Sequence, residues 1–307
     1  MITVFGSLNV DYVFQMDRLP QPGETLLASN LTVLPGGKGG NQALAAAKAG
    51  AGVRMIGAVG KDGLGNIALA GLSANGVDTS HVTKLEQTTG TAAINVDADG
   101  ENSIVVFPGA NGGASHLQLE GCGFADTAIL LLQFEIPSAE IEKAISLAKQ
   151  SGTRVIWNLA PMQPVPLAVL KDVDCLLINQ GELDALCKSL GLVSGDRTNL
   201  SHKDGIRAVA ELTGQSVVVT LGAKGCAAFH QNRLIEVTAL PVTPIDTVGA
   251  GDAFAGAFAA ALDQNQTFED ALNWGNVAGA LACLQPGAQS SLPTHAQIVQ
   301  RLPDLAP

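Results

Sequence analysis

The chain has 307 residues, of which 47% are hydrophobic, so it is long enough to bury a sizeable core. Its 17 Lys and Arg against 28 Asp and Glu give a formal net charge of −11, and no basic run occurs. This balance excludes the electrostatic footprint of a nucleic-acid-binding protein. The five cysteines are scattered and form no C-x-x-C pair, so they indicate neither a disulfide framework nor a zinc site.

The sequence carries no pattern typical of a membrane or secretory segment. No uncharged apolar stretch reaches about 18 residues, and Met1 leads into a strand-like run without a basic leader or a cleavage site. Together with the unpaired cysteines, these features predict a reduced, cytoplasmic protein with no membrane partner.

Short apolar runs alternate with segments of helical period along most of the chain. The expected strands are 2–8, 53–59, 128–133, 155–158, 175–178 and 217–221. Helices are expected from the glycines at 36–40 to Gly50, and at 138–150, 180–190, 202–212 and 271–283. This alternation predicts one α/β domain over 1–307, with a doubly wound, mostly parallel central sheet and helices on both faces.

Two regions, 11–34 and 91–107, interrupt that rhythm with period-two alternation typical of hairpin strands. Each is inserted after a core strand and is not a separate segment of its own. We therefore expect these strands to pair into a small second sheet that serves as a lid on the main domain.

Polar residues and glycines cluster where the first two strands are expected to end. Asn9 and Asp11 follow strand 2–8, and Pro35-Gly-Gly-Lys-Gly-Gly-Asn41 opens an alanine-rich helix. Ligands of parallel sheets bind at the carboxyl ends of the strands, and Asn and Asp side chains suit vicinal hydroxyls. The alternatives are a simple turn at Asn9 and Asp11, and an anion loop or plain helix entry at the glycines.

Two further segments follow later strands. Asn179 and Glu182 stand at i and i+3 at the start of a helix, where they suit Mg²⁺ held through water, or form a capping box. Thr220-Leu-Gly-Ala-Lys-Gly225 could line a nucleotide phosphate, or be only a hairpin turn.

The segment Asp246-Thr-Val-Gly-Ala-Gly-Asp252 runs into a helix expected from about residue 250. Its free N–H groups and positive dipole end would form an anion site. A carboxylate beside a bound phosphate accepts a proton from an attacking hydroxyl in kinase catalytic loops, which is the role we expect for Asp252. The alternative is an N-cap Asp beside turn glycines.

Five motifs, in their order along the chain, resemble those of the ribokinase-like carbohydrate and nucleoside kinases. They are Gly6-Ser-Leu-Asn-Val-Asp11, Gly36-Gly-Lys-Gly-Gly-Asn-Gln42, Asn179 with Glu182, Thr220–Gly225 and Asp246–Asp252, and the resemblance covers essentially the whole chain. The resemblance implies ATP-dependent phosphorylation of a primary hydroxyl. It implies that Asp252 is the general base and that the amides of Gly249, Ala250 and Gly251 form the anion hole.

The family members that phosphorylate ribose give the best match on the sugar side. The resemblance implies sugar contacts at Asn9, Asp11, Gly37, Asn41, Glu135 and Asp252, and transfer to the 5-hydroxyl of D-ribose to give ribose 5-phosphate and ADP. Lys38 either assists phosphate binding or is a solvated residue at a helix start. The resemblance also implies a homodimer formed through the lid.

On the nucleotide side, the resemblance implies ATP contacts at Asn179, Thr220, Gly222, Gly225, Gly251 and Asn276, with Mg²⁺ held through water by Glu182. It further implies a K⁺ site formed by Asp246, Val248, Ala282, Gln285, Gly287 and Ser291. Two positions depart from the pattern, because Gly40 stands where Ala is usual and Ser290 where Pro is more usual. Neither change removes a contacting side chain.

Two other functions remain open at this point. The substrate could be another sugar or a nucleoside, since Tyr12, Phe14 and Phe107 in the expected lid could form the aromatic pocket that the base of a nucleoside requires. A non-catalytic sugar or nucleotide sensor is the third possibility, although sensing alone requires no base at Asp252.

Overall fold

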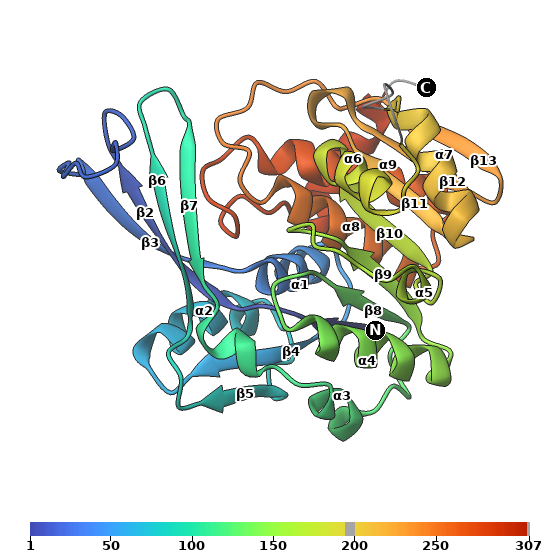
Figure 1. Cartoon of the computed structure of the whole chain (residues 1–307), viewed down its shortest axis with the longest axis horizontal. Coiled ribbons are helices and arrows are strands. Elements are labelled where there is room, and N and C mark those ends of the chain that lie inside the picture. The colour runs from blue at the N-terminus through green and yellow to red at the C-terminus, as the bar shows by residue number, and fades with distance from the viewer. Residues whose placement is uncertain (194–199, 306–307) are drawn as a thin grey trace.

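A nine-stranded sheet forms the body of the protein in a computed structural model, which describes residues 1–193 and 200–305 (Figure 1). In spatial order its strands are β13 (Arg233–Val237), β12 (Cys226–His230), β11 (Ser216–Thr220), β10 (Cys175–Asn179), β9 (Arg154–Asn158), β8 (Ile129–Leu132), β1 (Ile2–Phe5), β4 (Val53–Gly60) and β5 (Val82–Leu85). The pairs from β11 to β5 are parallel, whereas β12 and β13 are antiparallel. This is the mostly parallel sheet that the sequence predicts.

Side chains of the central strands alternate between two cores, one on each face of the sheet. In β8, Ile129 and Leu131 belong to one core, and Leu130 and Leu132 belong to the other. The first core includes α1 (Lys38–Lys48), α2 (Gly63–Ala74), α8 (Ala250–Asp263), α9 (Phe268–Ala282) and α10 (His295–Arg301). The second includes α3 (Leu117–Cys122), α4 (Ser138–Ser151), α5 (Leu167–Leu170), α6 (Gln180–Ser189) and α7 (His202–Thr213). Helices therefore cover both faces, as predicted.

Local capping explains where several helices begin and end. The Ser201 hydroxyl accepts a hydrogen bond from the Asp204 N–H at the start of α7, and Gly214 ends this helix in the left-handed region. Thr267 caps α9 in the same way, by accepting from the Asp270 N–H. These caps satisfy N–H and carbonyl groups that the ends of a helix leave without partners.

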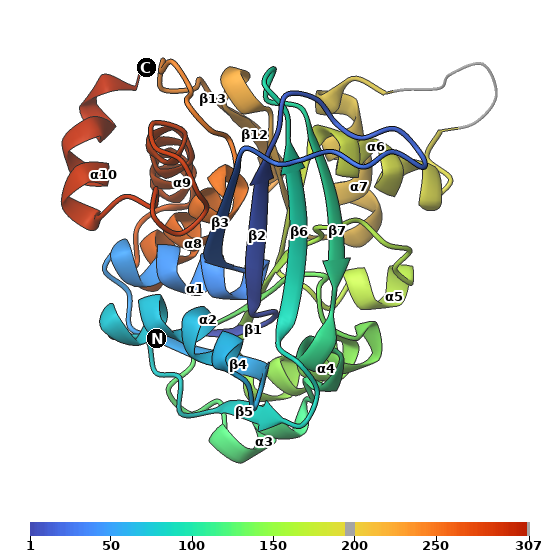
Figure 2. The ribbon, with the colours of Figure 1, turned by 90° about the vertical axis from the view of Figure 1, so that its left-hand side faces the viewer.

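A second sheet of four strands stands beside the body and projects beyond it (Figures 1 and 2). Its order is β3 (Asn30–Gly36), β2 (Asn9–Gln15), β6 (Gly90–Val96) and β7 (Asn102–Phe107). The two hairpins β2–β3 and β6–β7 join through a parallel pairing of β2 with β6. The inserted strands thus form the small second sheet that the sequence predicts.

The helices α1 and α8 pack backbone against backbone. A Cβ atom placed on Gly256 of α8 would lie 2.5 Å from the Cβ of Ala45 and 2.7 Å from the N of Ala46. No side chain larger than hydrogen fits there, so the spacing of the two helices is set by main-chain contact. In the described part of the chain, no helix has both the length and the apolar character needed to cross a membrane.

Candidate active site

The site lies at the carboxyl ends of the parallel strands, between the starts of α1 and α8. A cavity of about 250 Å³ opens there, and it is lined by Lys38, Asn158, Ala160, Leu177, Ile178, Asn179, Glu182, Thr220, Thr247, Gly249, Gly251, Asp252, Phe254 and Ala255. Residues from three strands (β9, β10 and β11) and three helices (α1, α6 and α8) therefore meet in one place, which is where open parallel sheets bind ligands.

Asp252 is the buried acid of this cavity. Its side chain is 6% exposed in the first turn of α8, and each carboxylate oxygen accepts one hydrogen bond. Asn41 Nδ2 donates to Oδ2 over 2.9 Å, and Gln42 Nε2 donates to Oδ1 over 2.8 Å. Both amides belong to the first turn and a half of α1, so the two glycine-rich helix starts are joined directly. The carboxylate binds side chains here and does not cap its own helix.

The loop before α8 leaves backbone donors directed away from the helix. Gly249 is the N-cap, with φ +79°, and the Ala250 N–H is turned back onto the Thr247 carbonyl at 3.3 Å. Within residues 1–193 and 200–305, the N–H groups of Gly249 and Gly251 have no backbone partner. Free N–H groups at the positive end of a helix form an anion-binding site.

The sugar-side residues come from the lid strand β2, from the starts of α1 and α8 and from the segment after β8, and only Lys38 and Asp252 among them line the cavity. The first strand ends at Phe5, so Asn9 and Asp11 are not in a turn after it but in β2 of the lid. Asp11 is half-buried, and its pKa rises to about 7 because burial disfavours its charge and the carboxylates of Glu135 and Asp252 repel it. The carboxylates of Glu135 and Asp252 therefore lie close enough to act on Asp11.

Glu135 and Asn9 are held partly by Ser7 and Asn111, neither of which was predicted as a site residue. Glu135 Oε2 accepts from the Ser7 hydroxyl over 2.6 Å and from the Lys38 N–H over 3.0 Å. Asn9 Oδ1 accepts from Asn111 Nδ2 over 2.7 Å, and the Leu8 N–H donates to Asn111 Oδ1 over 2.8 Å. These contacts fix the orientation of two of the predicted sugar-binding side chains.

Gly37 packs against the same segment. It has φ +85°, and a Cβ at this position would lie 2.8 Å from the Asn9 N. A side chain here would be strained and would also collide with backbone, so the position requires glycine.

Lys38 is half-buried among acids and is not a solvated lysine, so that interpretation is wrong. The carboxylates of Asp252, Glu135 and Glu182 together raise its pKa against the opposing effect of burial. A permanent positive charge thus stands in the cavity between the sugar-side and nucleotide-side residues.

Of the predicted nucleotide-side residues, Asn179, Thr220, Gly251 and the Mg²⁺ candidate Glu182 line the cavity, and two of these also have structural partners. Asn179 and Glu182 form a capping box, with the Glu182 N–H donating to Asn179 Oδ1 over 2.9 Å and the Asn179 N–H donating to Glu182 Oε2 over 2.8 Å. Burial raises the pKa of Glu182. Thr220 ends β11, and the Thr220–Gly225 segment is indeed a turn between β11 and the antiparallel β12.

Gly225, Asn276 and Gly222 lie outside the lining of this cavity. Gly225 has φ +95°, and a side chain there would run into the Val237 carbonyl oxygen. Asn276 is buried, and its Nδ2 donates to the Thr238 carbonyl over 2.6 Å. Gly222 begins the short 3-10 turn of the hairpin. The structure gives the first two residues packing and hydrogen-bonding roles of their own.

The residues expected to hold a monovalent cation converge beside the start of α8. Asp246 Oδ1 accepts from the Val248 N–H and Oδ2 from the Gly287 N–H, each over 2.9 Å. The carbonyl oxygens of Val248, Ala282, Gln285 and Gly287 accept no hydrogen bond from the residues that the structure describes. Carbonyl oxygens without donors are suitable ligands for a hard cation, so this residue set fits one.

The two departures from the family pattern are accommodated locally. A Cβ on Gly40 would lie 3.1 Å from Leu8 Cδ2, so alanine would fit only after a small shift. The Ser290 hydroxyl donates to the Pro286 carbonyl over 2.7 Å and so closes the loop in which proline is more usual.

No group of three or more His, Cys, Asp and Glu residues in the described chain is placed to hold a metal ion.

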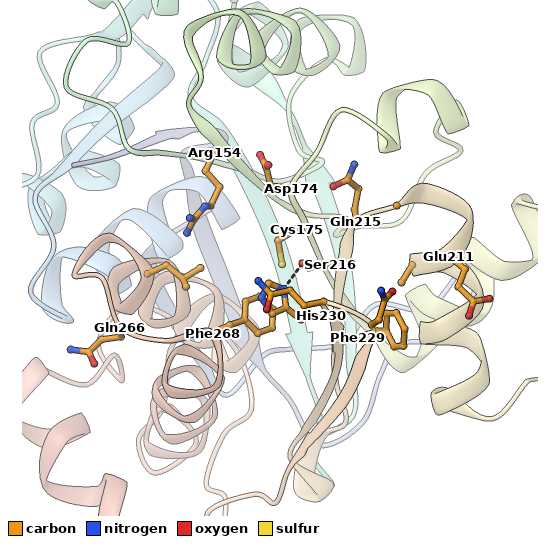
Figure 3. Close-up of a pocket in the computed structure, with 15 residues that line it drawn as sticks. Arg154, Asp174, Cys175, Glu211, Gln215, Ser216, Phe229, His230, Gln266 and Phe268 are labelled. Carbon is orange, nitrogen blue, oxygen red and sulfur yellow. Dashed lines mark hydrogen bonds between the residues drawn. The ribbon is translucent and has the colours of Figure 1, made fainter.

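A larger cavity of about 770 Å³ lies at the opposite, amino ends of the strands, where β9, β10 and β11 begin (Figure 3). His230 Nδ1 hydrogen-bonds the Ser216 hydroxyl at 2.8 Å, and its ring stacks on Phe268 with centroids 3.9 Å apart. Arg154 and Asp174 face it from the strand starts. None of the predicted site residues lines this cavity, so size alone does not locate the site.

The model of the "pfkB family carbohydrate kinase" group matches residues 1–295. The chain belongs to the pfkB family of carbohydrate kinases. This carbohydrate kinase is therefore a phosphotransferase that acts on a sugar hydroxyl.

Its curated relatives match over nearly their whole length. The chain is 34% identical to a ribokinase of Haemophilus influenzae, covering 98% of each sequence. It is 31% identical to a deoxyribokinase of Salmonella typhi, again with 98% of each covered. The relatives of this kinase thus include enzymes named for two different pentoses.

Solved structures agree with this assignment. A ribokinase of Thermotoga maritima superimposes with a TM-score of 0.90 at 33% identity, covering 98% of this chain and 99% of that one. An Arabidopsis thaliana ribokinase complexed with ribose and ATP superimposes with a TM-score of 0.86 at 31% identity, covering 98% of both chains. These comparisons establish the ribokinase-like fold of the carbohydrate kinase.

Proposed function

We propose that this carbohydrate kinase transfers the terminal phosphoryl group of ATP to the 5-hydroxyl of D-ribose, giving ribose 5-phosphate and ADP. The observation that carries the proposal is the convergence of Asn41, Asp11 and Glu135 on Asp252, which itself lines the cavity: Asn41 donates to Asp252, and the charges of Glu135 and Asp252 act on Asp11. Such a set of hydroxyl partners suits a polyhydroxylated sugar, and leaving any of them unpaired in the complex would weaken binding. The ribokinase relatives support this choice of sugar.

In the proposed mechanism, Asp252 accepts the proton of the attacking hydroxyl. The free N–H groups of Gly249 and Gly251, with Ala250 between them, stabilise the charge that develops on the transferring phosphoryl group. Removal of one such preorganised donor typically costs about 3 kcal/mol of transition-state stabilisation. Lys38, half-buried in the same cavity, adds a fixed positive charge.

The nucleotide is proposed to lie toward Asn179, Thr220 and Gly222. On the same side, Gly225 packs against the Val237 carbonyl, and Asn276 donates to the Thr238 carbonyl. Mg²⁺ would be held through water by Glu182 and would supply neutralisation of the phosphate charge. K⁺ would be held by the carbonyl oxygens of the loops that Asp246 joins, together with Ser291. These assignments follow the family pattern and the fit of the residues present.

The lid is proposed to form a homodimer interface. Its strands expose large apolar side chains to solvent, namely Leu31, Val33, Ile104, Val105, Val106 and Phe107, each at least 41% exposed. Such a concentration of exposed apolar side chains on one small sheet is typical of an interaction surface.

The experiment that tests the proposed reaction is a coupled ADP-release assay over D-ribose, 2-deoxy-D-ribose, hexoses and nucleosides. We expect the highest kcat/KM for D-ribose, and a higher kcat in K⁺ than in Na⁺ at equal ionic strength. A higher kcat/KM for 2-deoxy-D-ribose would replace the proposed substrate with the sugar for which the Salmonella typhi relative is named. Preference for a nucleoside would contradict the sugar assignment itself.

A further inference from the structure

Two chains of buried amides lead into the carboxylate of Asp252 from opposite sides. On one side, Gln133 Nε2 donates to Gln42 Oε1 over 2.7 Å, and Gln42 Nε2 donates to Asp252 Oδ1 over 2.8 Å. On the other side, Gln289 Nε2 donates to Asn41 Oδ1 over 3.1 Å, and Asn41 Nδ2 donates to Asp252 Oδ2 over 2.9 Å. Each oxygen of the carboxylate thus terminates its own two-amide chain.

These five side chains are almost completely removed from solvent. Gln42 and Gln133 are 0% exposed, Asn41 is 5% exposed, and Asp252 and Gln289 are 6% exposed. Hydrogen bonds between polar groups are stronger in such surroundings, and an unpaired group is correspondingly costly. A polar cluster buried this deeply has a fixed geometry.

The direction of donation is the same along both chains. An amide donates only from its nitrogen and accepts only at its oxygen, so an ionised carboxylate requires the nitrogen of its neighbour. That neighbour then turns its oxygen outward, where a second nitrogen must meet it. Gln133 and Gln289 supply these nitrogens, while their own Oε1 atoms have no hydrogen-bond partner in the described chain.

The side-chain amide of Gln42 makes a third hydrogen bond, which also fixes its orientation. Its Nε2 also donates to Asn158 Oδ1 over 3.0 Å, and Asn158 Nδ2 in turn donates to the Leu177 carbonyl over 3.1 Å. Gln42 therefore uses both amide hydrogens and its oxygen. Turning this amide over would place its oxygen against two acceptors, which locks the orientation.

We infer that Gln42, Gln133 and Gln289 are positioning residues that orient the carboxylate of Asp252 toward the bound hydroxyl. This inference rests on the base role proposed for Asp252. With one amide on each oxygen, the plane of the carboxylate is fixed at the place where Asp252 lines the cavity. Gln133 and Gln289 act only through Gln42 and Asn41.

The test uses substitutions that keep the volume but remove the amide, Gln133→Met and Gln289→Met, each measured with saturating and limiting D-ribose and ATP. Displacement of a catalytic group by about 1 Å lowers rates by on the order of 10²-fold. We expect kcat to fall at least about tenfold, while the KM values for both substrates change less than about threefold. Loss of general structure would instead alter KM and lower the melting temperature.

A matched control is Gln118→Met in α3, where Nε2 donates to the Gly57 and His81 carbonyls and to the Thr83 hydroxyl, outside the cavity lining. We expect this change to lower the melting temperature and leave kcat unchanged. If Gln133→Met fails to fold, Gln289→Met on the 284–291 loop provides the same test.

The possible failures are distinguishable. Turnover retained by Asp252→Asn would refute the base role, and the positioning role with it. An inactive Asp252→Asn beside glutamine variants with unchanged kcat, or with KM effects alone, would refute the positioning role and leave the base role intact.

Discussion

The amide of Asn41 donates a 2.9 Å hydrogen bond to the carboxylate of Asp252, across 211 positions of the sequence. The contact joins the glycine-rich start of α1 to the glycine-rich start of α8. In the proposed function, a sugar hydroxyl held beside Asn41 would therefore lie next to the base, and the phosphoryl group would lie next to free helix N–H groups. Sugar binding and proton removal are thus assigned to two residues in direct contact.

Asp252→Asn should abolish turnover while leaving the volume of the site unchanged. The amide cannot take a proton at neutral pH, and its nitrogen replaces one of the two oxygens that accept from Asn41 and Gln42, so the resulting donor–donor contact should also lower the melting temperature. We expect kcat to fall by roughly 10³-fold or more, as is common when a catalytic group is lost. Calorimetry should show D-ribose and ATP affinities within a few-fold of the parent enzyme. Normal turnover would show that another group removes the proton.

Alanine substitutions in the anion loop should separate a structural glycine from a functional one. A Cβ at Gly251 would meet no atom within 4 Å, so Gly251→Ala should fold normally but occupy space beside the proposed phosphoryl position. A Cβ at Gly249 would lie 2.8 Å from Ala288 Cα, at φ +79°.

We therefore expect Gly251→Ala to lower kcat or raise the KM for ATP at an unchanged melting temperature. Gly249→Ala should lower the melting temperature as well. Steady-state kinetics and thermal unfolding of the two variants provide the comparison, and equal melting temperatures would contradict the assignment.

Asp11 should make stability depend on pH in a specific direction. Its folded pKa of about 7 lies above the ordinary value of 3.8, so the folded chain retains a proton that the unfolded chain releases. Its contribution therefore becomes destabilising as the pH rises from about 4 to about 7. Asp11→Asn removes this ionisation.

We expect Asp11→Asn to raise the melting temperature relative to the parent protein at pH 8 and to have little effect at pH 4. The same change should raise the KM for D-ribose more than the KM for ATP. A melting-temperature difference that is equal at both pH values would contradict the titration of Asp11 in this range.

The exposed lid residues should control the oligomeric state. Val105 in β7 is 67% exposed, and a charge there would have to be buried in a lid-to-lid interface. We expect light scattering to show a dimer for the parent protein and a monomer for Val105→Arg. Val299→Arg in α10, where the parent valine is 43% exposed, is the control and should remain dimeric. A monomeric parent protein would contradict the proposed interface.

The parts of the fold that follow from local sequence were predicted well. Helix 202–212 lies within one residue of α7, because Ser201 and Gly214 provide strong local signals. The first strand was predicted too long. It ends at Phe5 because Gly6 packs tightly, where a Cβ would lie 2.9 Å from Gly39 Cα, and the chain then enters the lid.

Other elements had weak signals. The segment of α2 contains Gly63, Gly65 and Gly71, which lower its helix propensity, although α2 forms with Asp62 as its N-cap. The antiparallel strands β12 and β13 at the sheet edge also escaped prediction. In β12, the small residues of Cys226–His230 do not alternate clearly between apolar and polar.

The candidate site was predicted through motifs and not through contacts. Asn41 and Asp252 stand in recognisable glycine-rich helix starts, whereas Gln42 and Gln289 resemble ordinary polar residues. Their bonds to Asp252 and Asn41 span 210 and 248 positions, so no local spacing reports them. The charge environment of Lys38 likewise exists only once three distant carboxylates have been brought together.

The absence of a side chain at Gly256 has a consequence for how new specificities can arise. With Ala45 against it, α1, which carries Asn41, and α8, which carries Asp252, are in direct contact. In the proposed function, this contact sets the distance from the sugar to the acid. Room for a different acceptor has to come from the opposite wall, in the strands of the small sheet, which is where engineering of this enzyme toward other alcohols should begin.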